Sequence, residues 1–389
     1  MVILLLHNRY RERGGEERSV AEQAALLRDR GHRVAVLERS SEALSGPGGR
    51  ARAARALLRG GESEHEVAAL VSRIGAEVVH AHNLHPLFGS RALHAARAAG
   101  ARTVLQLHNF RLTCAIGVAY QDGAVCHRCS GRNTWPGVRL RCRGELAESV
   151  VYAAGLALQQ PRILAGTDRF IALSEAGRMR LGALGLPLER TEVISNPLEQ
   201  RAFSPVSEAD RGRYALCVGR LVPEKGFDTA VQAARAAGVP LQIVGRGPDE
   251  ARLRRLSGDG DVQLLGELEP SELEHVRRGA AVQLAPSRWE EPSPYAVLEA
   301  MAAGVPVLVS GLGGLPELAG PEASLPPLDT AAWTRSLVAL WNDPEDRRRR
   351  GDAARMRAWA RAAPERVHAA LMGVYERAGA RPEKSSVPG

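Results

Sequence analysis

The sequence lacks several features that would place the protein in a special class. No stretch approaches the roughly 20 consecutive apolar residues that a membrane-spanning helix needs. The opening MVILLLHNRY is too short an apolar run, with no basic residue before it, for a secretory signal. Aromatic residues make up only 4% of the chain, which argues against the stacking platforms of a single-stranded nucleic-acid-binding protein. Glycine (40) and proline (23) fall short of the low-complexity range, which excludes a fibrous chain.

What remains is a chain of 389 residues, 44% hydrophobic and 25% charged. Such a chain can bury a large core and is too long for one ordinary domain, so we expect two globular domains. Five cysteines, an odd number, argue against a disulfide framework and favour the reducing cytoplasm.

The positive charge is uneven and almost entirely arginine. Through residue 200 there are 27 arginines against 19 acidic residues, whereas beyond it 25 basic residues balance 25 acidic ones. The excess in the first half favours anionic partners, either the headgroups of an anionic membrane or a phosphorylated acceptor. A solvated arginine-rich face in an arginine-biased proteome explains it equally well. Lys225 and Lys384 are the two lysines, and Lys225 lies in a glycine-containing turn.

Short apolar, β-branched runs alternate with helical stretches rich in Ala, Leu and Arg, which is typical of βαβ units and parallel sheets. The first series of predicted strands is Val2–Leu6, Arg33–Leu37, Glu77–Ala81, Thr103–Leu107, Arg169–Leu173 and Glu192–Ile194. The second series is Tyr214–Val218, Leu241–Val244, Val262–Leu265, Val282–Leu284 and Val305–Val309. The segment Asn196–Arg213 between them, with two prolines and several charges, is interpreted as a linker.

The fold class is therefore α/β, with two Rossmann-like, doubly wound parallel-sheet domains facing across a cleft. The predicted domains are residues 1–198, which include a cysteine-containing loop at 110–143, and residues 199–343. We expect C-terminal helices over 344–379 that pack back toward the N-terminal domain, and a polar tail at 380–389.

The strongest chemical signal is the stretch APSRWEEPSPYAVLEAMAAGVPVLVSGLGG at 285–314. A helix is expected to begin with Ser293 as its N-cap and Pro294 in its first position, because proline has no N–H to leave unpaired. Glu291 and Glu299 then lie about 80° apart on the helical projection, so both carboxylates can reach one ligand. The helix end predicts a site for phosphate or sugar hydroxyls at the amides of Tyr295, Ala296 and Val297. An ordinary amphipathic helix with two solvated glutamates is the alternative.

The segment VGRLVPEKG follows the first strand of the second domain and places Arg220 and Lys225 at the carboxyl end of the sheet. A guanidinium fork and an ammonium point charge can together neutralise a diphosphate. Two surface cations are the alternative reading. The segment IVGRGP at 243–248 is a strand with a glycine turn, which is weak support for a ligand site and equally typical of a tight βα connection.

In the first domain, Gly14 and Gly15 precede a helix and can bring backbone close to a phosphate, although they do not form a dinucleotide GxGxxG fingerprint. A simple helix N-terminus is the alternative. His108 lies immediately after a predicted buried strand, where a side chain opens on a ligand cleft. A purely structural histidine is the alternative there.

Four of the five cysteines lie within 29 positions, spaced C-x11-C-x2-C-x12-C. A tetrahedral thiolate site for zinc would stabilise this polar loop. Free thiols and a redox role are the alternatives to zinc, and His127 is a possible substitute ligand. Cys217 lies inside a predicted strand and is expected in the core. The expected zinc ligands are Cys114, Cys126, Cys129 and Cys142.

Taken together, these motifs resemble the family 4 glycosyltransferases, retaining enzymes of the GT-B fold that use nucleotide-sugar donors. The resemblance rests on the Gly-Gly-Glu near the start, His108, ALSE around Ser174, SNP at Asn196, VGRLVPEKG, IVGRGP, the Glu291-to-Glu299 spacing, EAMAAGVPV and GGLPEL. The Pro-Tyr after Glu291 and the four cysteines are similar to a subgroup that works in surface-polysaccharide or secondary-metabolite assembly.

The resemblance implies that a hexosyl unit passes from an NDP-sugar, UDP or GDP above all, to a saccharide, lipid-linked or secondary-metabolite acceptor. Arg220 and Lys225 would hold the donor diphosphate, Glu299 the ribose, Glu291 the transferred sugar, Gly15 a phosphate and His108 the sugar near the reacting carbon. We further expect no redox cofactor, a cytoplasmic enzyme with peripheral contact to an anionic membrane, and no nucleic-acid partner. A GT-B nucleotide-sugar epimerase and a zinc-stabilised nucleic-acid-binding protein are the alternatives.

Overall fold

The chain of this computed structural model, which describes residues 1–10, 14–258 and 260–380, divides into two compact units. The first unit contains Met1–Ala119, Cys126–Pro197 and the chain from Glu365 on. The second unit contains Tyr120–Val125 and Leu198–Pro364. The tail expected at 380–389 lies, beyond Ala380, outside the described residues.

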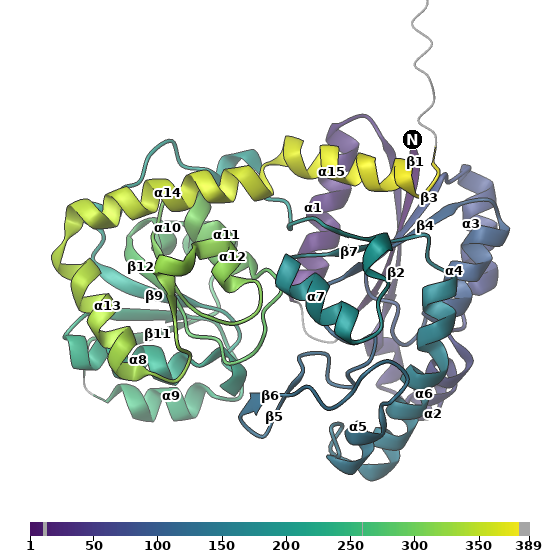
Figure 1. The fold of residues 1–389 in the computed structure, drawn as a ribbon, viewed down its shortest axis with the longest axis horizontal. Helices are drawn as coiled ribbons and strands as arrows, with labels where there is room; N and C mark the ends of the chain where they lie inside the picture. The colour runs from purple at the N-terminus through teal and green to yellow at the C-terminus, as the bar shows by residue number, and fades with distance from the viewer. Residues whose placement is uncertain (11–13, 259, 381–389) are drawn as a thin grey trace, which may run out of the picture. The chain divides into compact units, whose positions relative to one another are not determined.

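The first unit is built on a parallel sheet with the strand order β2-β1-β3-β4-β7-β8. Figure 1 labels the first five of these strands. The strands are β1 (Val2–Arg9), β2 (Arg33–Ser40), β3 (Val78–Ala81), β4 (Arg102–Leu107), β7 (Arg169–Ala172) and β8 (Thr191–Val193). All six predicted strands are confirmed, because each is a short apolar run that pairs with a parallel neighbour. Their carboxyl ends therefore lie along one edge of the sheet.

Helices connect these strands and cover the sheet. They are α1 (Gly15–Asp29), α2 (Gly49–Arg59), α3 (Glu64–Ile74), α4 (Gly89–Ala98), α6 (Leu146–Ala165) and α7 (Glu175–Ala183), with 3-10 turns at Ser41–Leu44 and Leu188–Arg190. Helix α1 packs Val20 and Leu27 against Ile3 and Leu5 of β1, and all four side chains are buried. Burying one such side chain contributes about 1.5–3 kcal/mol, so the sheet is a firm base for the loops at its carboxyl edge.

The cysteine-containing segment 110–143 connects β4 to α6. It contains a short helix, α5 (Trp135–Arg139), and a hairpin of β5 (Tyr120–Gln121) and β6 (Ala124–Val125). Asp122 (φ 54) and Gly123 (φ 79) make the hairpin turn, as expected for an Asp-Gly pair with positive φ at both positions. The hairpin belongs by its contacts to the second unit, whereas the rest of the segment belongs to the first.

The second unit has its own parallel sheet, with the order β11-β10-β9-β12-β13-β14. The strands are β9 (Tyr214–Val218), β10 (Leu241–Val244), β11 (Val262–Gly266), β12 (Ala280–Ala285), β13 (Val307–Ser310) and β14 (Ser324–Leu325). The five predicted strands are confirmed. The two-residue β14 was not predicted, because an edge strand of this length carries no periodicity.

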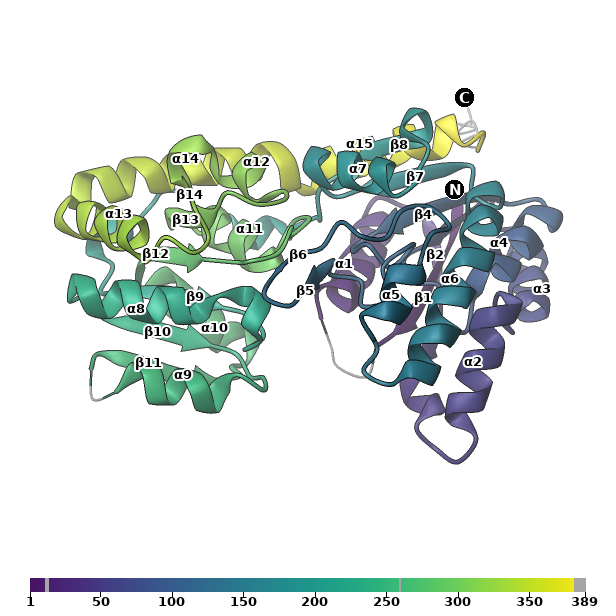
Figure 2. The same cartoon turned by 60° about the horizontal axis from the view of Figure 1, so that its bottom comes forward.

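Both faces of the second sheet are covered by helices. They are α8 (Phe227–Ala237), α9 (Glu250–Ser257), α10 (Pro270–Arg278), α11 (Tyr295–Ala302), α12 (Leu315–Ala319), α13 (Thr330–Asn342) and α14 (Pro344–Ala362), with 3-10 turns at Gln200–Ala202, Ala209–Arg211, Pro223–Lys225 and Pro321–Ala323. Helices α8 and α13 lie side by side (Figure 2), where the fully buried Trp333 packs with Ala230 and Ala234. Leu298 of α11 and Ala358 of α14 belong to a separate core cluster.

The C-terminal helical region is divided between the units. Helix α14 packs in the second unit, and α15 (Pro364–Arg377) packs Leu371 and Tyr375 into the core of the first. Ala363 between them is extended (ψ 139), as expected for a residue that precedes a proline. The helices expected at 344–379 are thus present, and of the two only α15 belongs to the first unit. No helix in the described part of the chain has the length and apolar character needed to cross a membrane.

Candidate functional site

Helix α11 begins at Tyr295, directly after the pair of prolines in the strongest sequence signal of the second unit. The prediction that Ser293 caps this helix is wrong by one residue. Pro294 is the N-cap, with extended dihedral angles (φ −74, ψ 127), because the two prolines hold the chain extended up to this point. The N–H of Val297 donates to the Pro294 carbonyl at 3.1 Å and closes the first turn of the helix. The expectation that this amide is open to a ligand is therefore wrong.

Glu291 lies in the loop after β12 and is only 4% exposed. Its Oε1 accepts hydrogen bonds from Lys225 Nζ at 2.7 Å and from the Ser287 hydroxyl. Lys225 ends the 3-10 turn after β9, the neighbour of β12 in the sheet. Gly226 allows this close approach, because it has φ +67 and a Cβ atom there would lie 2.1 Å from the Pro286 carbonyl oxygen. The structure thus brings a carboxylate and an ammonium group together from two adjacent strand ends.

Glu299 has a different cation. Its Oε2 accepts from Arg277 Nη2 at 2.6 Å, and the two side chains are only 11% and 7% exposed. Arg277 lies in the last turn of α10. The sequence did not predict Arg277, because it is 22 positions away and nothing distinguishes it from its arginine neighbour. The two glutamates of the motif are therefore each neutralised separately, Glu291 by Lys225 and Glu299 by Arg277.

Arg220 is exposed on the loop that follows β9. This loop packs backbone to backbone on the IVGRGP loop after β10: a Cβ atom on Gly245 would lie 1.9 Å from the Gly219 carbonyl oxygen, and one on Gly247 would lie 2.3 Å from that of Leu221. Leu221 N–H also donates across this contact at 2.8 Å. The two glycines therefore serve a tight βα connection, and this connection holds the Arg220 loop in place.

A second group of charges lies at the start of α8. Asp228 accepts from Arg288 Nη2 at 2.7 Å and from Arg252 Nη1 at 3.0 Å, and Arg252 also bonds Asp249 at 2.6 Å. Burial raises the pKa of Asp228, but the hydrogen bonds from Arg252 and Arg288 outweigh it and lower the pKa overall. Arg288 is three residues before Glu291 on the loop after β12, so the same loop carries both a cation and the buried carboxylate. The sequence did not predict these ion pairs around Asp228, because their members come from separate segments.

In the first unit, Gly14 is the N-cap of α1 and is exposed. Glu17 folds back over the start of the helix and accepts from the N–H of Gly14 at 2.8 Å and from that of Tyr10 at 3.0 Å. This is a capping box, in which the third helical residue satisfies amides at the helix start. The Gly14 amide is therefore already bonded, which leaves Gly15 as the better candidate of the two glycines predicted to bind phosphate.

His108 lies directly after β4 in a row of stacked imidazoles. Its Nε2 is hydrogen-bonded to Nδ1 of His82 at 2.9 Å, and His82 stacks on His80, whose Nδ1 is bonded to the Tyr375 hydroxyl at 2.8 Å. Burial lowers the pKa of His108 to about 3 and that of His80 to about 3. His108 is therefore neutral at physiological pH and can act toward a ligand by hydrogen bonding, not as a cation.

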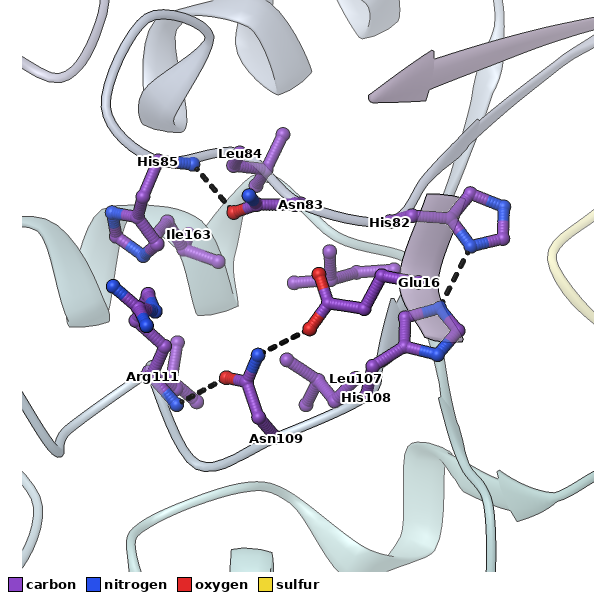
Figure 3. Close-up of a pocket in the computed structure, with 12 residues that line it drawn as sticks. Glu16, His82, Asn83, Leu84, His85, Leu107, His108, Asn109, Arg111 and Ile163 are labelled. Atoms are coloured by element: carbon purple, nitrogen blue, oxygen red, sulfur yellow. Dashed lines mark hydrogen bonds between the residues drawn. The ribbon is translucent and has the colours of Figure 1, made fainter. Parts of the chain in front are cut away.

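A small pocket opens beside His108 (Figure 3). Its polar lining consists of Glu16, His82, Asn83, His85, His108, Asn109 and Arg111, and its apolar lining of Leu84, Leu105, Leu107, Leu112 and Ile163. Most of these residues come from the start of α1 and from the loops after β3 and β4. The sequence predicted a ligand role only for His108 among them, because the residues are brought together by elements far apart in the chain.

The clustered cysteines are free thiols and partly buried. Burial, together with the neighbouring thiols of Cys114, Cys142 and Cys126, raises the pKa of Cys129 to about 11, so the four thiols share one neighbourhood. Within the described residues, however, no group of three or more His, Cys, Asp or Glu side chains could hold a metal ion. The structure does not show the expected zinc site, because the thiols are near one another without converging. Cys217 is fully buried in β9, as predicted.

Two family models match consecutive parts of the chain. Residues 14–197 match the glycosyl transferase 4-like domain, and residues 199–357 match glycosyl transferases group 1. The two matches meet at the boundary between the units near residue 198.

Curated relatives include two mannosyltransferases of Mycolicibacterium. The chain is 32% identical over 205 residues to the MMP alpha-(1->4)-mannosyltransferase of Mycolicibacterium hassiacum, covering 50% of each chain. It is 33% identical over 230 residues to the phosphatidyl-myo-inositol mannosyltransferase of Mycolicibacterium smegmatis, covering 53% of this chain and 56% of the relative. The chain thus spans about half the length of the curated relatives it matches.

Solved structures share the fold over nearly the whole chain. A sucrose-phosphate synthase from Thermosynechococcus elongatus has a TM-score of 0.72 at 19% identity, covering 97% of this chain and 98% of that one. Anabaena HepE, solved in complex with UDP, has a TM-score of 0.65 at 17% identity, covering 97% and 100%. These likenesses confirm the predicted α/β fold class of two parallel-sheet domains.

Proposed function

The chain belongs to the glycosyltransferases, with a 4-like domain followed by a group 1 domain, and from this premise we propose that it transfers a hexosyl unit from an NDP-sugar with retention of anomeric configuration. The acceptor is a saccharide, a lipid-linked saccharide or a secondary metabolite. Relatives named as GDP-mannose-dependent and a structural neighbour solved with UDP support GDP or UDP as the donor nucleotide.

The observation that carries the proposal is the pairing of Lys225 with Glu291 at the carboxyl edge of the second sheet. Ligands bind at this edge in open α/β folds. The carboxylate fixes the ammonium group, and Arg220 lies exposed on the same loop. Two cations can thus bind a diphosphate: Lys225, which is held by Glu291, and Arg220, whose side chain is exposed to solvent.

We assign roles on this basis. Arg220 and Lys225 bind the diphosphate and stabilise the negative charge that develops as it departs, the effect that usually contributes most to catalysis. Glu299 accepts hydrogen bonds from the ribose hydroxyls, Glu291 holds the transferred sugar, and the amides of Tyr295 and Ala296 at the start of α11 support the donor. In the first unit, Gly15 offers its backbone to a phosphate and His108 donates or accepts a hydrogen bond at the sugar.

In this mechanism the acceptor oxygen attacks the anomeric carbon on the face from which the diphosphate leaves. The bond from the anomeric carbon to the phosphate oxygen breaks and its electron pair stays with the diphosphate, while the acceptor hydroxyl gives up its proton to a basic group at the site. Because attack and departure use the same face, configuration is retained without a covalent sugar–enzyme intermediate.

Contact with an anionic membrane is proposed for the first unit. Trp135 of α5 is 68% exposed, and Leu146 and Val150 of α6 are 52% and 45% exposed. Exposed apolar side chains together with an arginine excess are suited to anionic lipid surfaces. Sedimentation with phosphatidylglycerol vesicles, but not with phosphatidylcholine vesicles, is the expected result; equal sedimentation with both would count against it.

Zinc in the four-cysteine segment is a separate proposal, supported by the position of Cys114, Cys126 and Cys142 close to the Cys129 thiol. Binding would draw their side chains together. Elemental analysis should find zinc in the purified protein and less of it after Cys126→Ser and Cys129→Ser, and purified wild type without zinc would end the proposal.

The test of donor binding is thermal stabilisation by UDP-, GDP- and dTDP-sugars, because a ligand that binds the native state raises its melting temperature. One nucleotide class should stabilise the protein, and Lys225→Ala should abolish both stabilisation and transfer while the fold is retained. Arg255→Ala, which removes an exposed cation from the same unit, is the matched control. Transfer by Lys225→Ala at the wild-type rate would refute the role of Lys225.

Product analysis separates transfer from epimerisation. With donor alone, an epimerase returns a changed NDP-sugar, whereas a glycosyltransferase releases NDP only as sugar passes to an acceptor or to water. A new NDP-sugar in that reaction would contradict the proposed function.

A further inference from the structure

Glu16 and Glu17 are adjacent carboxylates in the first turn of α1, yet their surroundings differ. Glu17 caps the helix through the amides of Tyr10 and Gly14, and its Oε1 lies 3.5 Å from Nε2 of His7. Burial opposes ionisation of Glu17, but the nearby His7 imidazole and the hydrogen bonds from these amides lower its pKa overall. The start of the helix is thus satisfied without Glu16, which leaves Glu16 with no structural task at the cap.

Glu16 lines the pocket beside His108 instead (Figure 3). The cavity measures about 30 Å³, which is enough for a water molecule or a hydroxyl group and too small for a sugar ring. Its walls are largely neutral side chains: amides, imidazoles and aliphatic groups. The Glu16 carboxylate can therefore contact a single hydroxyl group in this pocket, but not a whole sugar.

Asn109 fixes the orientation of the Glu16 carboxylate. The Asn109 Oδ1 accepts the N–H of Arg111 at 2.8 Å, so the amide nitrogen must point the other way. This Nδ2 donates to Glu16 Oε1 and lies 3.3 Å from the Tyr10 hydroxyl. The guanidinium of Arg111 lies over the Tyr10 ring, 5.1 Å from its centroid, and donates to the Ile116 carbonyl. One carboxylate oxygen is therefore held by a neutral amide.

Among the residues that the structure describes, the titratable and charged groups around Glu16 come from β1 and the residue after it, from the start of α1 and from the loops after β3 and β4. They are Tyr10, Glu17, His7, His82, His85, His108 and Arg111. Burial raises the pKa of Glu16 to about 7 against the opposing effects of Arg111 and His7. Burial also lowers the pKa of His85 to about 4, so this imidazole adds no positive charge at neutral pH. Two adjacent carboxylates with pKa values displaced in opposite directions are a recurring sign of acid–base function.

On the premise of the proposed function, we infer that Glu16 accepts the proton of the attacking hydroxyl in the pocket of the first unit. The hydroxyl oxygen forms the new bond to the anomeric carbon, its proton passes to the Glu16 carboxylate, and the electron pair of the broken sugar–phosphate bond leaves with the diphosphate. The proton returns to solvent before the next turnover. A water molecule in the same place would give slow hydrolysis of the donor.

The experiment compares wild type with Glu16→Gln, using GDP-mannose and UDP-glucose as donors and measuring NDP release to water and to methyl α-mannoside. Loss of a general base lowers the rate by about 10²–10⁴-fold. We expect that loss in kcat for Glu16→Gln, with donor stabilisation of the melting temperature unchanged. The acidic limb of the wild-type pH profile should lie near pH 7. Glu189→Gln, the same change at an exposed residue of the same unit, should leave both rate and profile unchanged.

A second variant separates a chemical role from a structural one. Asn109→Asp places a second carboxylate beside Glu16 and should move the acidic limb of the profile to higher pH, since like charges disfavour ionisation. A side chain that only supports the fold would change the amplitude of the profile without moving the limb.

The outcomes are distinguishable. If wild type is stabilised by none of the UDP-, GDP- and dTDP-sugars and releases no NDP, the proposed function fails. If wild type turns over and Glu16→Gln keeps more than a tenth of its kcat, or the acidic limb stays in place in Asn109→Asp, the proposed function stands and the role of Glu16 is overturned.

Discussion

Replacing Glu16 by glutamine should stabilise the protein, and increasingly so as the pH rises. Glu16 has an ordinary pKa near 4.5 that burial raises to about 7 in the folded chain. A raised carboxyl pKa contributes stability that is fully present below pH 4.5 and is lost as the pH rises through 7, because the unfolded chain then releases a proton that the folded chain retains. The neutral amide of the Glu16→Gln variant mimics the protonated carboxyl group and escapes this loss.

The size of the effect follows from the two pKa values. Linkage gives a loss of about 0.8 kcal/mol for wild type at pH 5 and about 3.4 kcal/mol at pH 8.5, so the difference between the two conditions is about 2.5 kcal/mol. For a unit of this size, 1 kcal/mol corresponds to roughly 2–4 °C in melting temperature. Glu16→Gln should therefore gain about 5–10 °C on wild type between pH 5 and pH 8.5.

The assay is circular-dichroism melting of both proteins across this pH range. Histidines and all other groups titrate in both proteins, so their effects cancel in the difference. Glu189→Gln controls for loss of one negative charge and should track wild type at every pH. A constant difference between Glu16→Gln and wild type from about pH 5 to pH 8.5 would show that Glu16 does not titrate near neutrality, and the reasoning about its pocket would be refuted.

Three further substitutions test other parts of the structure. Arg277→Met removes the cation that is bonded to the buried carboxylate of Glu299 and should cost about 3–5 kcal/mol in urea unfolding; a loss below about 1 kcal/mol would contradict the buried pair. Gly226→Ala combines a positive φ with a clash against backbone and should abolish donor stabilisation, whereas Gly238→Ala, which has a similar φ of 63 and open space, should cost only about 1–2 kcal/mol and bind donor normally. Tyr375→Phe removes the hydroxyl bonded to a buried histidine and should lower stability by about 1–2 kcal/mol, measured by urea unfolding; an unchanged midpoint would contradict that bond.

The sheet strands could be predicted from the sequence because burial on both faces leaves a local mark. A run such as Ile3–Leu6 has to be apolar throughout to lie between two helical layers. It can therefore be recognised as a strand without knowing which strands pair with it. The Glu291 motif and Lys225 were recognised for a similar reason, since each lies next to a strand end marked by its own turn residues.

The partnerships of these residues could not be predicted, because they depend on contacts between distant segments. Glu299 meets Arg277 across 22 positions, and Glu16 meets Asn109 across 93. The first residue of a helix depends on backbone dihedral angles that the sequence does not give. Pro294 rather than Ser293 is the N-cap of α11, because the backbone of Pro294 is still extended.

The central claim is that the second unit binds a nucleoside diphosphate through Lys225. Calorimetric titration of wild type and Lys225→Ala with UDP and with GDP tests it most directly. One of the two nucleotides should bind wild type, and its affinity should fall at least tenfold, about 1.4 kcal/mol, in the variant. Equal affinity in the two proteins, or no binding of either nucleotide to wild type, would contradict the account.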